Sequence, residues 1–498
     1  MTAPQPIRPP VLGHVLRGSV LVLSGGFIVL YIAVALARIT FPYELEWMEG
    51  GAVDHTRRLL AGQPLYVRPS LEFVPYVYPP LYFEVCALVG RATGAGFATM
   101  RAVSFAASLG CLLLLFLMAR RETGSRAAGL FAATYRLSGA WLDLARVDSL
   151  FLMLALASAY VLRGGDGVWR CAAAGALMCL SFLTKQPAVL VAIPLALQEF
   201  LRRRGVARLA FLVAFAAPAA GAVALLNAHS DGWFGYYLLD LPRQHTLESH
   251  LILGFWSQDI ARHLPIAAGM AAVWLAARRR AAGGTSRLFV SCLAAGLMAA
   301  SWTGRVHAGG YDNVLLPACA GLALLFGLSA HAFAYPAGGA GEGRAALVSL
   351  LCSIQLLMLV YNPMAQIPTR ADVLAGGRLV HWMRQIPGDV YLPMHGYLPA
   401  LAGKPTWAHA QAIDDVLRGT DPDLRGQLNL QLTQALVEAR FGAVLVDSVG
   451  WPFQDEMEGR YKHLGRLWNE PDVLMSRTGL RTRPDHVYLL RGAGPPPR

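Results

Sequence analysis

The chain has 498 residues, of which 55% are hydrophobic and only 15% charged, and its mean hydropathy is +0.43. This composition excludes an ordinary soluble globular domain. The formal net charge of +12 could suggest a nucleic-acid partner. Because the arginines are concentrated in loops between apolar runs, we favour a membrane protein that binds no nucleic acid. All seven cysteines lie in apolar stretches without metal-ligand spacing, so we expect no thiol chemistry.

Eleven apolar stretches are long enough, or nearly so, to cross a bilayer as helices. They cover residues 17–39, 99–119, 126–142, 148–163, 169–184, 187–201, 207–228, 263–278, 287–303, 313–333 and 345–362. We therefore predict a polytopic α-helical membrane protein with about 11 transmembrane helices, within a range of about 10–13. The first stretch is longer than the apolar core of a signal peptide, about 7–15 residues, which predicts an uncleaved helix.

The loops between these stretches alternate in character, and every second loop is rich in arginine. These loops carry Arg120, Arg121 and Arg126, then Arg163 and Arg170, then Arg202, Arg203, Arg204 and Arg208, then Arg278, Arg279, Arg280 and Arg287, and finally Arg344. Under the positive-inside rule these loops face the cytoplasm. The N-terminus is then cytoplasmic, the C-terminus is extracytoplasmic, and the chemically unusual loops lie on the outer face of the cell membrane.

The first outer loop, about residues 40–98, has structure of its own. The sequence predicts a helix over Glu49–Leu60, followed by Gly62, which suits a helix end. The apolar piece at 79–90 is too short to span a bilayer, so we place it at the outer surface. A second outer stretch, 229–262, carries aromatic residues that fit either an interfacial belt or a binding surface.

Hydropathy falls after Asn362, which predicts a transmembrane domain over 1–362 and an extracytoplasmic domain over 363–498. In the second part a strand at 389–394 precedes a helix near 423–441 and a strand at 443–447. This order predicts a small α/β domain.

Three acids, Glu44, Glu46 and Glu49, fall within six residues immediately after the first membrane helix. They fit a solvated loop, a metal site or a general base. The adjoining Trp47 and Met48 indicate a partly desolvated setting, which raises a carboxyl pKa toward values useful to a base.

Further polar residues mark the ends of later helices on the same face. Arg146 and Asp148 open a helix, where an acid can serve as a simple cap. Lys185 is either a boundary lysine or the partner of a phosphate, since it lies on the outer side against the positive-inside bias. The segment 307–313 runs from His307 through paired glycines to Asn313 and fits either a turn or a ligand loop. Arg243, with His245 nearby, is a weaker candidate.

These motifs together resemble the C-type (GT-C) integral-membrane glycosyltransferases, which include protein O-mannosyltransferases and lipid A aminoarabinose transferases. The resemblance spans residues 15–362. It rests on Glu49-Gly50 through Ala61-Gly62-Gln63-Pro64-Leu65-Tyr66, Tyr78-Pro79-Pro80-Leu81-Tyr82, Arg146-Val147-Asp148, Leu183-Thr184-Lys185-Gln186 and Gly309-Gly310-Tyr311-Asp312-Asn313. One departure is that the family's Asp-Glu pair is Met48-Glu49 here, with Glu46 two residues earlier.

The resemblance implies inverting transfer of a sugar from a polyprenyl-phosphate donor to a glycan, lipid or protein acceptor outside the cytoplasm. Glu49 or Glu46 is the expected general base, with Glu49 favoured because it matches the family's Glu-Gly step. The expected substrate-binding residues are Asp148, Arg146, Lys185, His307, Asn313, Tyr78 and Arg243. A divalent Mg²⁺ or Mn²⁺ held by Glu46 and Asp148 stays open, because carboxylates suit hard ions.

Two other functions compete with this interpretation. A transporter or lipid-linked glycan flippase predicts charged residues buried along a path, for which Arg101 and Arg136 are the main candidates. A non-catalytic envelope assembly subunit predicts that the acidic cluster is dispensable.

Overall fold

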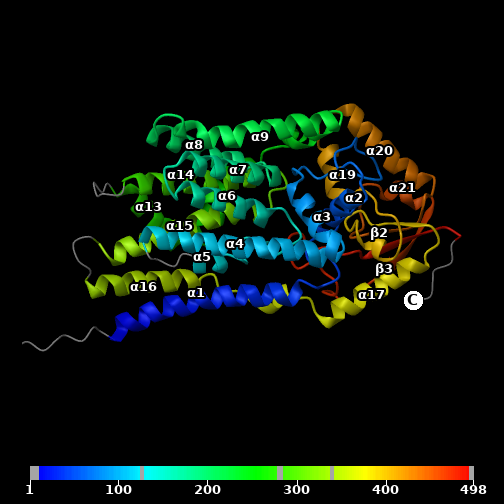
Figure 1. Cartoon of the computed structure of the whole chain (residues 1–498). Helices are drawn as coiled ribbons and strands as arrows, with labels where there is room; N and C mark the ends of the chain where they lie inside the picture. The colour runs from blue at the N-terminus through cyan, green and yellow to red at the C-terminus, as the bar shows by residue number, and fades with distance from the viewer. Residues whose placement is uncertain (1–10, 124–127, 278–283, 337–340, 493–498) are drawn as a thin grey trace, which may run out of the picture.

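The computed structural model describes residues 11–123, 128–277, 284–336 and 341–492. Long helices lie side by side in a bundle, and a small sheet with shorter helices covers one end of it (Figure 1). The helices of the bundle are α1 (Val11–Arg38), α4 (Phe97–Thr123), α5 (Ala128–Ala133), α6 (Asp148–Leu162), α7 (Val168–Thr184), α8 (Ala188–Arg202), α9 (Ala207–His229), α13 (Pro265–Ala276), α14 (Gly284–Val306), α15 (Leu316–Ala334) and α16 (Glu342–Leu357).

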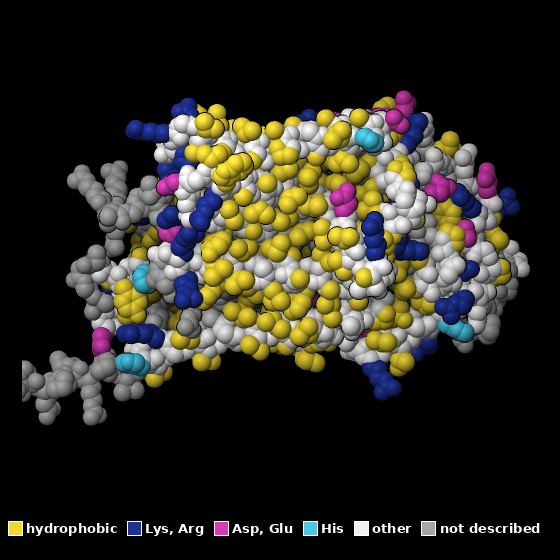
Figure 2. Space-filling view, viewed as in Figure 1, with side chains coloured by type: hydrophobic (Ala, Val, Ile, Leu, Met, Phe, Trp, Pro, Cys, Tyr) yellow, Lys and Arg dark blue, Asp and Glu magenta, His cyan; other side chains and the backbone are white. Residues whose placement is uncertain are grey.

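Five helices among the described residues are long and apolar enough to cross a membrane. They are Gly13–Arg38, Phe97–Glu122, Ala207–His229, Arg287–Val306 and Asp312–Ala334. Three shorter apolar helices accompany them: Asp148–Leu162, Val168–Thr184 and Pro265–Ala276. Figure 2 shows a broad hydrophobic band over the bundle, with charged side chains gathered toward its two ends. The polytopic helical fold is confirmed, whereas the number of spans stays a prediction.

One predicted helix, 126–142, is wrong in length. Within the described part of this stretch the helix α5 covers only Ala128–Ala133. The backbone then turns through Gly139 and Ala140, whose φ angles are 72° and 59°. The buried Arg38 donates to the Ala140 carbonyl at 2.7 Å and forms an ion pair with Asp143 at 2.7 Å. This left-handed turn lies beyond the end of α5 and prevents a helix from running on to residue 142, and the ion pair holds the turned segment inside the bundle.

The arginine-rich ends of the helices gather at the end of the bundle where α1 begins (Figure 1). Arg120 and Arg121 lie in the last turn of α4, and Arg202 lies in that of α8. Arg126 and the run Arg278–Arg280 lie outside the described residues. The other end of the bundle carries the first predicted outer loop, so the two ends differ as the sequence predicts. Which end faces the cytoplasm stays a prediction.

The predicted outer loops are folded against the end of the bundle. The first contains α2 (Glu49–Leu60), with the predicted bounds, and α3 (Leu81–Thr93). The second forms short helical pieces: α10 (Trp233–Gly235), η1 (Tyr236–Asp240), α11 (Leu241–Gln244), α12 (Ser249–Gly254) and η2 (Phe255–Ala261). The loop after α14 leads into η3 (Asp312–Leu315), which precedes α15.

The residues after the bundle form a four-stranded sheet flanked by helices. The elements are η4 (Pro363–Gln366), α17 (Arg370–Gln385), β1 (Asp389–Tyr391), α18 (Leu398–Leu401), α19 (Ala410–Leu417), α20 (Pro422–Val437), β2 (Phe441–Val446), α21 (Gln454–Glu458), β3 (Tyr461–Arg466) and β4 (His486–Leu490). The strand order is β1-β2-β4-β3, with β1 parallel to β2 and the other pairs antiparallel.

This C-terminal part shares a hydrophobic core with the first outer loop. Trp47 and Val53 from the loop belong to the same buried cluster as Ile413 and Leu428 from α19 and α20. Glu46 also forms an isolated parallel bridge with Thr478. The loop is therefore fixed between the bundle and the C-terminal part, and the domain boundary at residue 362 stays a prediction.

Candidate active site

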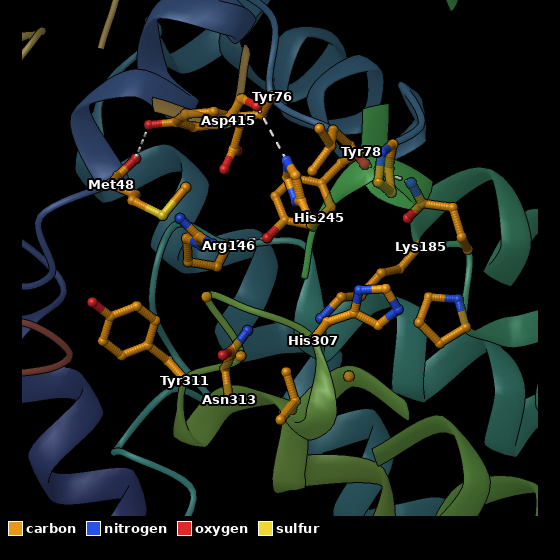
Figure 3. Close-up of a pocket in the computed structure, with 18 of the residues that line it drawn as sticks. Met48, Tyr76, Tyr78, Arg146, Lys185, His245, His307, Tyr311, Asn313 and Asp415 are labelled. Carbon is orange, nitrogen blue, oxygen red and sulfur yellow. Dashed lines mark hydrogen bonds between the residues drawn. The ribbon is translucent and has the colours of Figure 1, made fainter. Parts of the chain in front are cut away.

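A cavity of about 380 Å³ opens where the bundle, the first loop and the C-terminal part meet. Six of the predicted site residues line it: Glu46, Tyr78, Arg146, Lys185, His307 and Asn313. Figure 3 shows Arg146, Lys185 and His307 around this opening, with Tyr78 above it and Asn313 below. Apolar side chains, including Leu190 and Val314, complete the wall beside the helices. Segments distant in sequence thus bring an acid, several cations and an apolar surface to one place.

Glu46 is the acid that the first outer loop contributes to this cavity. Its side chain is fully buried, and neither carboxyl oxygen has a hydrogen-bond partner among the described residues. Its Oε2 lies 3.6 Å from Nη1 of Arg146. Burial raises the pKa of Glu46 to about 8, although the Arg146 charge opposes that rise. A carboxyl with a pKa of about 8 beside an open cavity is suited to accept a proton.

Glu49, which the sequence favoured, is buried behind the cavity and does not line it. It accepts from Arg101 at 2.9 and 2.6 Å and from the backbone N–H groups of Leu45 and Ala145, each at 2.8 Å. Burial alone would raise the pKa of this carboxyl, but Arg101 and the two N–H groups hold it below its ordinary value. Its oxygens are already bonded, so its geometry is that of a structural anchor.

Glu44 is also buried, but on the side of the loop that faces the C-terminal part. Its carboxyl pairs with Nδ1 of His395, whose Nε2 lies 3.2 Å from Asp447. Burial disfavours the imidazolium, but the charges of Asp447 and Glu44 raise the pKa of His395 to about 10. This buried charged group connects the acidic loop to β2 and its following turn.

Arg146 presents its guanidinium to the cavity between two aromatic rings. Its Cζ lies 5.7 Å from the ring centre of Tyr78 and 5.8 Å from that of Trp141, distances typical of cation–π contacts. Nη2 donates to the Tyr78 hydroxyl at 3.1 Å, while Nη1 has no hydrogen-bond partner among the described residues. A buried N–H donor without a partner beside a cavity is suited to an anion.

Lys185 and Asp148 form an ion pair beside Tyr78, whose ring centre lies 5.9 Å from the Lys185 Nζ. The Lys185 Nζ lies 2.5 Å from Oδ1 of Asp148, and the same oxygen accepts from Asn313 at 3.0 Å. Lys185 thus has a carboxylate partner that the sequence did not predict, and Asp148 does not itself line the cavity. Asp148 positions the lysine and the asparagine, which both face the opening.

The loop that carries His307 depends on its glycines. Gly309 has a φ of +87°, and a Cβ on Gly310 would overlap the carbonyl oxygen of Gly304. Arg305 fastens the loop by donating to the Gly310 carbonyl at 2.9 Å. Burial, assisted by the neighbouring His245, lowers the pKa of His307. His307 is therefore a neutral N–H donor at neutral pH, held at the edge of the cavity.

The sequence did not single out the residues that the C-terminal part contributes. Gln411 and Asp415, on α19, line the cavity and are joined by a hydrogen bond of 2.8 Å. Burial raises the pKa of Asp415 to about 7. His245, from the second loop, donates to the Asp415 carbonyl at 3.1 Å, whereas Arg243 is exposed and does not line the cavity. No local motif marks α19, because only the tertiary fold brings it to the site.

The donor set of the cavity does not fit a dedicated metal site. Glu46 faces Arg146, and Asp148 is paired with Lys185, so each carboxyl already has a cationic neighbour. No group of three His, Cys, Asp or Glu side chains suited to a metal occurs in the part of the chain that the structure describes.

Comparison with solved structures shows that the chain has the fold of the C-type membrane glycosyltransferases. Two matching structures are of ArnT, an aminoarabinose transferase, from Cupriavidus metallidurans. The form bound to undecaprenyl phosphate aligns with a TM-score of 0.61 at 14% identity, covering 95% of this chain and 99% of ArnT. The apo form aligns with a TM-score of 0.55 at 14% identity, covering 93% and 98%. No family model and no curated protein sequence matches the chain. The resemblance drawn from the motifs is thereby confirmed at the level of the fold.

Proposed function

We propose that this protein is a glycosyltransferase that moves a sugar from a polyprenyl-phosphate donor to an acceptor hydroxyl at the outer face of the membrane. The observation that carries the proposal is the cavity itself. It combines Glu46, a buried carboxyl that titrates near pH 8, with the cations Arg146 and Lys185 at the end of an apolar helix bundle. Such a transfer requires a proton acceptor and cationic groups that bind phosphate in the same cavity.

A lipid-linked phosphate fits the wall of the cavity. Arg146 offers a free N–H donor, and the ammonium group of Lys185 has further donors beyond the one directed at Asp148. Neutral His307 would add a third donor. Leu190 on α8 and Val314 beside α15 supply the apolar surface for the first units of the chain. ArnT, which has the same fold, was solved with undecaprenyl phosphate.

In the reaction we propose, Glu46 takes the proton of the acceptor hydroxyl as that oxygen attacks the anomeric carbon. The bond between this carbon and the phosphate oxygen breaks on the opposite face, so the configuration inverts. Negative charge grows on the departing phosphate, where Arg146, Lys185 and His307 stabilise it. Buried donors of this kind act strongly because little water competes with them.

Two buried arginines of the bundle are each paired with a carboxylate, which argues against a transport path. Arg101 is neutralised by Glu49, and Arg38 by Asp143, each in a fixed local pair. Arg136, the other residue considered for a relay, is exposed. A path would require such charges to follow one another along an open route.

The experiment that tests the proposal uses purified protein in nanodiscs with a panel of polyprenyl-phosphate sugars and membrane-derived acceptors. We expect time-dependent release of polyprenyl phosphate together with a glycosylated product from at least one donor. Donor movement across liposome membranes without cleavage of the sugar–phosphate bond would contradict transfer and favour a flippase.

A further inference from the structure

A second cavity, of about 370 Å³, lies between α1, α15 and α16. Its volume falls within the range of small-molecule sites, about 300–1,000 Å³. The lining residues that matter for its chemistry are Arg17, Phe326, Ala330, His331, Tyr335 and Leu356. None of them lines the candidate active site.

This cavity lies at the opposite end of the bundle from the candidate active site. Asn313 and Val314, at the start of the segment leading into α15, line the active-site cavity, whereas His331 and Tyr335, at the other end of α15, line the second one. A helix of this length, Leu316–Ala334, is roughly 28 Å long. The second cavity is thus at the arginine-rich end.

The lining changes from cationic and polar to apolar along the helices. Arg17 near the start of α1 and His331 and Tyr335 near the end of α15 form the polar end. Nearer the middle of the bundle the wall is dominated by side chains such as Phe326 and Leu356. This arrangement matches an amphiphile with an anionic head group at the membrane surface and a hydrocarbon chain directed inward.

Arg17 is half-buried and differs from the arginines that are buried within the bundle. Arg38 and Arg101 each have a carboxylate partner. Arg17 forms no ion pair among the described residues, and its buried Nε has no hydrogen-bond partner there. No Asp or Glu lines the cavity, and the segments outside the described residues contain none. The cavity therefore carries an uncompensated positive charge.

We propose that this cavity binds one anionic phospholipid of the surrounding leaflet. The phosphate is held by Arg17 and His331, and one acyl chain lies along the apolar wall between α1 and α16. Basic pockets between transmembrane helices at the cytoplasmic side are favourable sites for such head groups, because the anion meets unpaired donors away from bulk water. The inference is independent of the proposed enzymatic function.

The test is native mass spectrometry of the purified full-length protein titrated with phosphatidylglycerol or with phosphatidylcholine of the same acyl chains. We expect one phosphatidylglycerol to be retained in preference to phosphatidylcholine. Arg17→Met should weaken that retention roughly ten- to a hundredfold, as expected for a lost charge-assisted contact. Arg344→Met is the matched control, since Arg344 is exposed at the same end but does not line the cavity.

A second variant tests whether lipid retention depends on the volume of the cavity, and not only on the charge of Arg17. Ala330→Phe fills the cavity and should abolish specific retention while Arg17 is unchanged. Equal retention of the two lipids, or equal loss in Arg17→Met and Arg344→Met, would overturn the proposal. Retention of undecaprenyl phosphate, but not of phosphatidylglycerol, in an Arg17-dependent manner would overturn it in favour of a carrier-lipid site.

Discussion

Replacement of Glu46 by Gln separates catalysis from folding at this site. The change preserves the shape of the side chain and removes its ability to accept a proton. With a pKa of about 8, only about a tenth of Glu46 is ionised at pH 7 in the free protein. The uncharged Gln therefore resembles the form that Glu46 already has for most of the time, and we expect the protein to fold and insert normally.

The expected effect on the chemical step is much larger. Loss of a general base costs about 10²–10⁴ in rate. We expect Glu46→Gln to lower the single-turnover rate within this range while donor binding changes little, since Arg146 and Lys185 remain. The assay follows sugar transfer by the purified variant in nanodiscs at saturating donor.

Two other Glu→Gln changes serve as controls. Glu72 is 55% exposed and paired at the surface with Arg440, so its replacement should leave both rate and stability unchanged. Glu49→Gln should instead lower thermal stability, because it leaves the buried Arg101 charge without its partner, a loss of about 3–5 kcal/mol. Full turnover by Glu46→Gln would refute the assignment of the base.

Three further predictions follow from the geometry and the loop pattern. Lys185→Met should weaken donor binding roughly ten- to a hundredfold in a lipid-binding titration, and unchanged affinity would mean that Lys185 serves only to pair with Asp148. The rate should rise about tenfold per pH unit below pH 8 and then level off as Glu46 loses its proton; a pH–rate profile that is flat from pH 6 to 9 would contradict this. A reporter active only outside the cytoplasm should be active when fused after Pro363, and activity after Arg204 instead would reverse the topology.

Much of the membrane part could be predicted from the sequence because apolar runs and basic loops are local signals. All eleven predicted spans contain a helix of the bundle, and α2 has the predicted bounds. The prediction for 126–142 is wrong in length, because α5 ends at Ala133 and Arg38 binds the turned segment that follows it at Ala140. That contact joins residues about a hundred positions apart, which no local pattern reveals.

The sequence predicted six of the residues that line the candidate site, but not how these residues are arranged in space. Spacing identified the acids of the first loop, and the Glu-Gly step favoured Glu49, but the environments of Glu46 and Glu49 depend on distant partners. Arg101 and two backbone N–H groups donate hydrogen bonds to the Glu49 carboxylate, whereas Arg146 lies 3.6 Å from Glu46. The contribution of Asp415 from α19 was missed for the same reason, since only the packing of the C-terminal part against the first loop brings it to the cavity.

The most direct test of the central claim compares cell-envelope glycans and glycolipids by mass spectrometry in a strain lacking this protein. The strain is complemented either with the wild-type chain or with Glu46→Gln at equal membrane abundance. The account predicts that one envelope species loses the mass of a sugar residue in the deletion strain, regains it with the wild-type chain and does not regain it with the variant. Envelope spectra that are unchanged by the deletion, or restored equally by Glu46→Gln, would contradict it.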